Sequence, residues 1–323
     1  MSYRRLTSLL DSRWLRIGLL VAVVGLAVWG LASQWTQVHA ALDELRPWDV
    51  VGALLCALAG LGCAMLAWRT LLADLGSPLP LPAAIRVMFL GQLGKYVPGA
   101  VWAVAAQVEL ARDYQVPRRR GATASLVSMA TTLVVALVMA GVMLPLTSSG
   151  AIRRYWWVLA ITPFAIACLH PAVVRTGLNL VLRVARKPPL EATVSMRGMA
   201  RALGWTAIGW GFYGLQAWLL VREFARGGDV RTVVLSFGAY ALAWSVGFLI
   251  IFFPGGIGPR EAALVAVLSP VMPAASALVV ALASRVVLTL GDLLWAGAGL
   301  AIGRRRRVPL PAEPVKPVHE SRQ

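Results

Sequence analysis

The chain has 323 residues, of which 59% are hydrophobic and 14% charged, and its mean hydropathy is +0.72. Soluble domains carry about 25% charged residues, so this composition excludes a soluble fold, a disordered chain and a disulfide-stapled secreted fold. Lysine and arginine outnumber aspartate and glutamate by 31 to 14, and in a membrane protein such an excess reports orientation rather than nucleic-acid binding. We therefore predict an all-α polytopic membrane protein with no nucleic-acid partner.

Apolar segments long enough to cross a membrane recur along the chain. A transmembrane helix needs about 20 such residues. The segments that qualify are 17–42, 50–68, 121–152, 155–174, 202–221, 232–259 and 262–284, the last continuing past Arg285 to about residue 302. The region 83–111 is also apolar but is interrupted by Arg86, Lys95, Pro98, Gly99 and Glu109. We therefore do not expect this region to form a simple lipid-facing span.

The positive charges predict how these segments are oriented, because lysine and arginine accumulate in cytoplasmic loops. Four arginine-rich segments are accordingly placed in the cytoplasm: 1–15, 112–120, 172–201 and 303–323. The regions 83–111 and 232–274 must then each enter and leave the membrane on one side, as re-entrant helical hairpins. Their turns are expected at Pro98-Gly99 and at Pro254-Gly255-Gly256. Arg153 and Arg154 go against this scheme, which rests on the overall count.

These assignments give about six full spans plus two re-entrant hairpins in one transmembrane domain, 16–302. Residues 16–145 and 155–302 form two halves with the same order of elements. Each half crosses three times, so the second half is predicted to be inverted relative to the first. Helices broken at matching places in inverted repeats are typical of a transporter's substrate site near mid-membrane. The alternative is that the glycines at these breaks only permit tight helix packing.

Three further segments have their own composition. Segment 172–187 carries Arg175 and Arg183 on one helical face, which predicts either an amphipathic helix on the cytoplasmic leaflet or an ordinary basic loop. The basic, proline-rich tail 303–323 lacks apolar periodicity and is expected to be disordered. The first span resembles a signal peptide, but its apolar stretch exceeds the usual length of about 7–15 residues, so we expect an uncleaved anchor.

Charged residues also fall inside the predicted membrane segments. They are Lys95, Glu109, Arg260, Glu261, Arg285 and Asp292. Each costs about 2.5–3.5 kcal/mol at the bilayer centre if unpaired, so each must pair, face a cavity or lie near an interface. We predict that Asp292 is the counter-charge of Arg285 when no lipid is bound, two helical turns away on the same helix face, either directly or bridged by Lys95 or water. A structural ion pair or a snorkelling end residue is the alternative for every member of this set.

Motifs of soluble catalytic chemistry are absent from the sequence. There is no G-x-x-x-x-G-K-S/T phosphate loop and no H-E-x-x-H, and the three histidines are far apart. The three cysteines lie in apolar runs without a C-x-x-C pair, as expected of core residues. We therefore predict no catalytic residue, no metal and no cofactor, and we expect that the protein is not an enzyme.

The two predicted hairpins resemble a known family. GQLGKYVPGAVW at 91–102 and FFPGGIGPREAALVAVL at 252–268, followed by Arg285 within ALASRVV, are similar to the lysylphosphatidylglycerol synthase transmembrane region, or flippase-like domain. The resemblance covers most of residues 15–300. After Gly258 the family usually has a small or β-branched residue, where this chain has Pro259.

The resemblance implies a multi-pass protein of the cell membrane that moves an anionic or phosphate-bearing lipid between leaflets, as in stand-alone members without an aminoacyl-transferase domain. The expected lipid is an anionic phospholipid or a polyprenyl-phosphate-linked glycan. The implied lipid- or phosphate-binding residues are Lys95, Tyr96, Pro98, Gly99, Trp102, Pro254, Gly255, Gly256, Gly258, Arg260 and Arg285. The implied gating or counter-charge residues are Glu109, Glu261 and Asp292.

Two other functions remain open at this point. One is a lipid-modifying transferase that would use Glu109, Glu261 or Asp292 as a base. The other is a non-catalytic membrane partner of an enzyme of envelope lipid or glycan synthesis, such as a synthase or a glycosyltransferase. The lack of a cofactor motif makes the transferase the less favoured of the two, and the partner role stays open beside the flippase.

Overall fold

The computed structural model describes residues 45–96, 102–147, 194–225, 229–250 and 258–305, with scattered helical positions between 153 and 176. The continuous ranges contain eight α-helices, two short 3₁₀ helices and, within those ranges, no strand. The α-helices are α4 (Pro47–Asp74), α5 (Leu81–Gln92), α6 (Trp102–Arg112), α7 (Arg118–Met143), α10 (Met196–Val221), α11 (Val230–Leu249), α12 (Pro259–Leu268) and α13 (Ala274–Arg305). The 3₁₀ helices η1 (Leu93–Tyr96) and η2 (Leu144–Thr147) follow α5 and α7.

Four of the described helices are long and apolar enough to cross a membrane: α4, α7 with η2, α11 and α13. The all-α membrane class predicted from composition is therefore confirmed. The predicted span 202–221 corresponds to α10, which is not among the four because its tryptophans, tyrosine and glycines lower its hydropathy. The predicted span 17–42 lies outside the described residues, as do most of 155–174, most of 172–187, the N-terminus and the tail from 306 onward.

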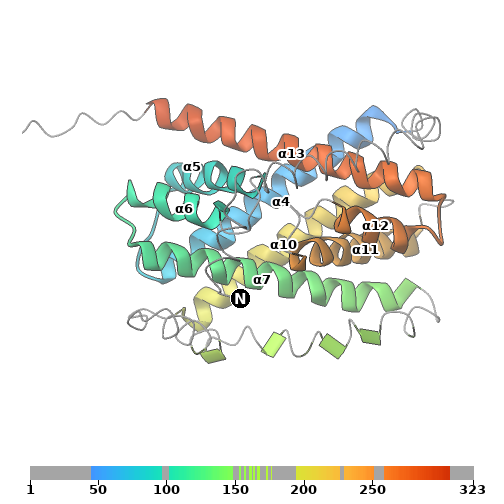
Figure 1. Cartoon of the computed structure of the whole chain (residues 1–323), viewed down its shortest axis with the longest axis horizontal. Helices are drawn as coiled ribbons and strands as arrows, with labels where there is room; N and C mark the ends of the chain where they lie inside the picture. Colours follow the sequence, from blue (N-terminus) through green and yellow to red (C-terminus); the bar gives the residue numbers. More distant parts are fainter. Residues whose placement is uncertain are drawn as a thin grey trace, which may run out of the picture.

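Helices α7 and α13 lie on opposite sides of the molecule, with α4, α10 and two pairs of shorter helices between them (Figure 1). Glycines let α4 and α10 approach closely. A Cβ at Gly60 would lie 2.5 Å from Cε1 of Tyr213, and one at Gly209 would lie 3.1 Å from Cβ of Cys63. In a membrane, apolar side chains gain little by leaving lipid for protein. Helices there associate instead through close packing, which small residues permit. Contacts run in opposite order along the two helices, so α4 and α10 are antiparallel.

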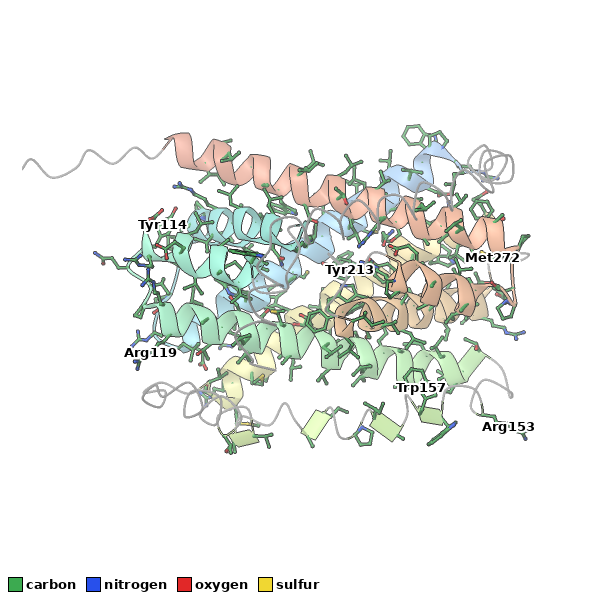
Figure 2. The ribbon with its side chains drawn as sticks, in the orientation of Figure 1. Tyr114, Arg119, Arg153, Trp157, Tyr213 and Met272 are labelled. Atoms are coloured by element: carbon green, nitrogen blue, oxygen red, sulfur yellow. The ribbon has the colours of Figure 1, made fainter. Side chains whose placement is uncertain are left out.

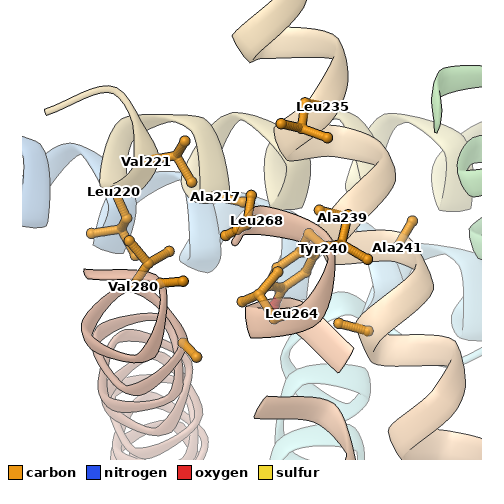
Figure 3. Close-up of a cluster of buried hydrophobic side chains, with 14 of the residues drawn as sticks. Ala217, Leu220, Val221, Leu235, Ala239, Tyr240, Ala241, Leu264, Leu268 and Val280 are labelled. Carbon is orange, nitrogen blue, oxygen red and sulfur yellow. The ribbon is translucent and has the colours of Figure 1, made fainter. Parts of the chain in front are cut away.

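Two buried cores flank this central pair. One combines the end of α4 with α5, α6 and the beginnings of α7 and α10. The other combines the beginning of α4 with α11, α12 and parts of α7, α10 and α13. Figure 3 shows part of the second core, where Leu220 of α10, Leu268 of α12 and Val280 of α13 pack together.

The first pair of short helices is α5 and α6, with 12 and 11 residues. Neither reaches the roughly 20 residues that a span requires. Arg120 donates from Nη1 to the carbonyl of Gly76 at 2.9 Å and to Oγ of Ser77 at 3.3 Å. The chain therefore begins and ends this segment at the same place. At the other end of the pair, Gly94 lies directly against the backbone of α6.

The second pair is α11 and α12, at the opposite end of the molecule's long axis (Figure 1). Helix α12 begins beside the middle of α11, where Arg260 contacts Tyr240. Gly258 precedes α12 with a φ of +95°, a conformation that favours glycine. Pro259 occupies the first helical position, where its missing N–H is not needed. The departure from the family pattern at Pro259 is thus accommodated as a helix start.

Polar contacts clamp α4 to α10 at both ends. Buried Asp49 at the beginning of α4 accepts from Nε of Arg222 at 3.2 Å and also pairs with its Nη2. At the other end, Asp74 accepts from the backbone N–H of Ser195 at 2.5 Å and from its hydroxyl at 2.7 Å. The same hydroxyl accepts from the N–H of Gly198 and caps α10.

We predict that Gly94→Ala destabilises the α5–α6 pair. The new Cβ would lie 2.8 Å from N of Ala103 and from C and O of Trp102, and these backbone atoms cannot rotate away. Overpacking of this kind costs about 1–3 kcal/mol. Thermal unfolding of the detergent-purified protein measures the loss. Gly204→Ala on α10, where nothing lies within 4 Å, is the control and should leave the melting temperature unchanged or raise it. Equal melting temperatures for Gly94→Ala and the wild type would contradict the close approach.

Candidate functional site

An ion pair joins the end of the α5 segment to α13. Nζ of Lys95, in η1, lies 2.5 Å from Oδ2 of Asp292, whose side chain is only 2% exposed. Nearby, the rings of Phe89 on α5 and Trp295 on α13 stack with centroids 4.8 Å apart. A carboxylate this deeply buried requires a cationic partner, because removing an ion from water costs several kcal/mol. The pair therefore fixes the first predicted hairpin against the last helix.

A second ion pair joins α12 to α13. Nε of Arg285 lies 3.1 Å from Oε1 of Glu261. The other carboxylate oxygen, Oε2, accepts from the backbone N–H of Gly258 at 2.6 Å. Glu261 thus neutralises a guanidinium and caps the N-terminus of α12 at the same time, as an acidic residue in the first turn does in a capping box.

Arg260 has an aromatic partner instead of a carboxylate. Its guanidinium donates to Oη of Tyr240, and its Cζ lies 4.9 Å from the centroid of the tyrosine ring. Half-buried Arg260 pairs with no carboxylate in the part of the chain that the structure describes. A cation over an aromatic face is attracted by the ring but keeps its full charge.

Tyr213 connects these contacts. Its ring centroid is 6.3 Å from that of Tyr240, on whose ring Arg260 lies. Figure 2 shows Tyr213 near the centre of the molecule. We call the connected set the central charged cluster; its members are Lys95, Tyr213, Tyr240, Arg260, Glu261, Arg285 and Asp292. Its three cations face two carboxylates, so the cluster has one positive charge in excess.

The structure brings partners from other elements to both charges. We expected Asp292 to balance Arg285 on the same helix, directly or through Lys95 or water, and the structure places Asp292 beside Lys95 and Arg285 beside Glu261. Side chains two turns apart on one helix can only partly point toward each other, whereas neighbouring segments approach each side chain directly. Each charge consequently pairs with a residue from another element.

Glu109 lies in a different environment from Glu261 and Asp292. It is exposed and pairs with Arg112 at 2.6 Å and Arg118 at 3.2 Å. The hydrogen bond from Arg112, followed by that from Arg118, lowers the pKa of Glu109. These contacts tie the end of α6 to the beginning of α7. The structure therefore does not bring Glu109 together with the central charged cluster.

The remaining predicted site residues fall at the breaks. Trp102 opens α6 and is partly exposed, and Gly258 precedes α12. Tyr96 ends η1, and its backbone alone is described. Five predicted positions lie outside the described residues: Pro98, Gly99, Pro254, Gly255 and Gly256.

Sequence reasoning missed the two tyrosines and one buried amide. Gln216 of α10 is fully buried, and its Oε1 accepts from Oγ of Ser284 at 3.4 Å. Ser284 immediately precedes Arg285 in α13. In the described part of the chain, its amide Nε2 has no hydrogen-bond partner. Hydroxyl and amide groups inside apolar segments were the available signal, but single polar residues are common in such segments. Within the described ranges, no three of His, Cys, Asp and Glu gather into a possible metal site.

A double-mutant cycle on the Lys95–Asp292 pair should show strong coupling. Lys95→Met leaves a buried carboxylate without its partner, and such losses cost about 3–5 kcal/mol. Adding Asp292→Asn removes that charge, so the double variant should be more stable than Lys95→Met alone. Thermal unfolding in detergent measures both. Glu109→Gln with Arg112→Gln is the exposed control and should show little coupling. Additive effects at Lys95 and Asp292 would contradict the pairing.

A comparison with known families gives a match. The profile of the family described as Lysylphosphatidylglycerol synthase TM region matches residues 14–296, which include every member of the central charged cluster. A search of curated proteins gave no match. Because the matched range covers most of the chain, this protein belongs to the lysylphosphatidylglycerol synthase transmembrane-region family.

Proposed function

We propose that this protein carries an anionic or phosphate-bearing lipid between the two leaflets of the cell membrane, and that the lipid headgroup binds at the central charged cluster. The observation that carries the proposal is Arg260, a half-buried guanidinium that pairs with a tyrosine and gives the cluster its excess positive charge. A cation in apolar surroundings is stabilised by an anion. The phosphate group of a bound lipid supplies that anion, whereas the protein without lipid has no additional carboxylate at this position in the described structure.

The two carboxylates of the cluster act in this proposal as placeholders for the phosphate. Glu261 holds Arg285 and Asp292 holds Lys95 while no lipid is bound. Phosphate oxygens take the same donors, and arginine binds them with two parallel hydrogen bonds. Displacing Glu261 also frees the N–H of Gly258, at the N-terminus of α12, for an anion. The returning carboxylates would then help to release the lipid.

Buried amide and hydroxyl groups support recognition of a polar headgroup. Gln216 has a donor without a partner in the described structure, and Ser284 lies beside it, next to Arg285. A lipid oxygen at this place would satisfy the amide, which otherwise costs about 1–3 kcal/mol. We therefore add Gln216 to the residues proposed to contact the headgroup.

The access route in this proposal uses the two helix pairs. We infer that α5–α6 and α11–α12 are re-entrant hairpins of two inverted halves, entering from opposite sides of the membrane with both termini in the cytoplasm. Helix α11 has the length of a full span, and in this proposal α12 returns the chain to the side on which α11 begins. Lys95 comes from the first pair, and Arg260 and Glu261 come from the second. Broken helices that meet near mid-membrane are the arrangement expected of a substrate site. The headgroup would reach the same cluster from either leaflet.

We propose transport rather than catalysis. A lipid-modifying transferase would need a carboxylate base, and the two carboxylates of the cluster, Glu261 and Asp292, are both held in ion pairs. The charged group of the cluster that has no carboxylate partner in the described structure is Arg260, and a cation suits the binding of an anion better than the abstraction of a proton.

Removing the arginines should weaken lipid binding at the central charged cluster. We expect Arg260→Ala and Arg285→Ala to lower about tenfold the copurifying amount of the phosphate-bearing lipid that the wild type transports, because each removes a charge-assisted pair of hydrogen bonds at this cluster. Lysine at either position should restore only part of the bound lipid, since an ammonium lacks the planar, two-pronged donor geometry of a guanidinium. Mass spectrometry of lipids extracted from the purified protein measures the amount. Arg231→Ala, an exposed arginine at the beginning of α11, is the matched control and should retain the lipid.

Vesicles containing the copurified lipid then test transport itself. The wild type should move this lipid to a leaflet accessible to a membrane-impermeant reagent, and Arg260→Ala should not exceed the protein-free rate. A lipid that binds to the wild type but is never moved would contradict transport and favour a non-catalytic partner role. Full activity of the lysine variants would show that charge alone matters, without the two-pronged geometry.

Single cysteines test the proposed topology in a variant without the native cysteines. Pro80→Cys and Gln115→Cys flank the α5–α6 pair and should both be protected from an impermeant thiol reagent added outside intact cells. Val230→Cys and Ala274→Cys flank the α11–α12 pair and should both react. Permeabilised cells provide the control for intrinsic reactivity. Labelling of one member of a pair without the other would contradict a re-entrant hairpin at that place.

A further inference from the structure

A second charged site lies where α4 ends and α10 begins. A cleft of about 490 Å³ is lined there by Arg69, Thr70, Ala73, Asp74, Gly198, Arg201 and Trp205. Tyr213 of the central charged cluster is about two turns further along α10 than Trp205, so the cleft is a separate place. None of its lining residues takes part in the transport proposed above.

Two guanidinium groups face this cleft. Arg69 lines the cleft and donates from Nε to the carbonyl of Leu79 at 2.7 Å, which fixes its side chain without using the terminal nitrogens. Arg201 is exposed and, among the residues that the structure describes, makes no ion pair or hydrogen bond. Two cations in one cleft repel each other unless an anion lies between them. Paired arginines match the oxygens of a phosphate group.

The one carboxylate at the cleft is directed elsewhere. Both oxygens of Asp74 accept from Ser195, at the N-terminus of α10. Gly198 makes this possible, because a Cβ there would lie 2.3 Å from Cγ of Asp74. Asp74 therefore satisfies the helix terminus, and neither Arg69 nor Arg201 pairs with it in the described structure. The cleft keeps an excess of positive charge.

The apolar surroundings indicate that the anion belongs to a lipid. Trp205 lines the cleft with 37% of its surface exposed, and Ile208, one turn further along α10, is 51% exposed. Tryptophan is enriched where a membrane protein meets the headgroup region, with arginine close by. A phosphate on the arginines would place an attached acyl chain along Trp205 and Ile208. A free anion would gain nothing from this surface.

We propose that this cleft binds the phosphate of an anionic membrane lipid, with Arg69 and Arg201 on the phosphate and Trp205 against the apolar part. The site is independent of lipid transport, and binding here does not require the central charged cluster. The chemistry expected of the ligand is a phosphate ester joined to hydrocarbon, as in phosphatidylglycerol.

Native mass spectrometry of the full-length protein with dioctanoyl phosphatidylglycerol tests the proposal. We expect Arg201→Gln to weaken the binding of one lipid molecule about tenfold, because a charged hydrogen-bond donor is lost. Arg201 holds nothing else in the described fold, so the variant should unfold at the wild-type temperature. Trp205→Ala should weaken binding of the same lipid. Arg119→Gln, which changes an exposed arginine on α7, is the control and should leave binding unchanged. Arg260→Ala should keep this binding, which separates the site from the central charged cluster.

Two further ligands distinguish the alternatives. Dioctanoyl phosphatidylcholine has no net charge and should bind much more weakly, and inorganic phosphate should bind more weakly still. Unchanged phosphatidylglycerol binding in Arg201→Gln would overturn the proposal. Inorganic phosphate binding as tightly as the lipid, with no effect of Trp205→Ala, would also overturn it and identify a site for a free anion.

Discussion

The ion pair between Lys95 and Asp292 holds together elements from opposite halves of the sequence. Asp292 is almost completely buried, and a carboxylate there is stable only beside a cation. The end of the α5 segment must therefore lie against the middle of α13, and the rest of the first helix pair follows it. Loss of either partner would leave the other charge in an environment where water cannot solvate it.

Close packing of α4 and α10 provides the frame for that pair. Apolar side chains gain little from leaving lipid for protein, so helix association in a membrane depends on backbone approach and polar contacts. Gly60 and Gly209 allow the two backbones to approach closely. The contacts Asp49–Arg222 and Asp74–Ser195 join the helices at their two ends. Tyr213 extends from this frame to Tyr240, on whose ring Arg260 of α12 lies. Structural glycines and buried charges are thus parts of one arrangement.

Charge balance distinguishes the two sites of this protein. In the central charged cluster, two cations are neutralised internally and Arg260 is left with Tyr240. At the cleft, Asp74 is occupied by Ser195 and two arginines remain. In both places a carboxylate accepts from a helix N-terminus. At the cleft both oxygens of Asp74 are used in this way, whereas Glu261 also neutralises Arg285. This use of acidic caps connects the local structure of α10 and α12 to anion binding.

The sequence by itself determined the class of the protein, its family and most of its helices. Runs of uncharged residues predicted α4, α7 and α13, because length and hydropathy alone decide whether a helix suits a membrane. The turns predicted at Pro98-Gly99 and at Pro254-Gly255-Gly256 lie outside the described residues, but they fall between η1 and α6 and between α11 and α12, since glycine and proline act locally. Lys95, Arg260, Glu261, Arg285 and Asp292 were recognised because charge is costly within apolar segments.

Only the tertiary structure decided how these residues combine. Asp292 pairs with Lys95 and Arg285 with Glu261, and Glu109 joins the exposed arginines Arg112 and Arg118. Tyr240 became a site residue because α12 begins beside it. Spacing along one helix describes which residues share a face, but an ion pair forms with whichever charge another segment brings within about 4 Å. That approach depends on the packing of distant helices, which no local pattern records.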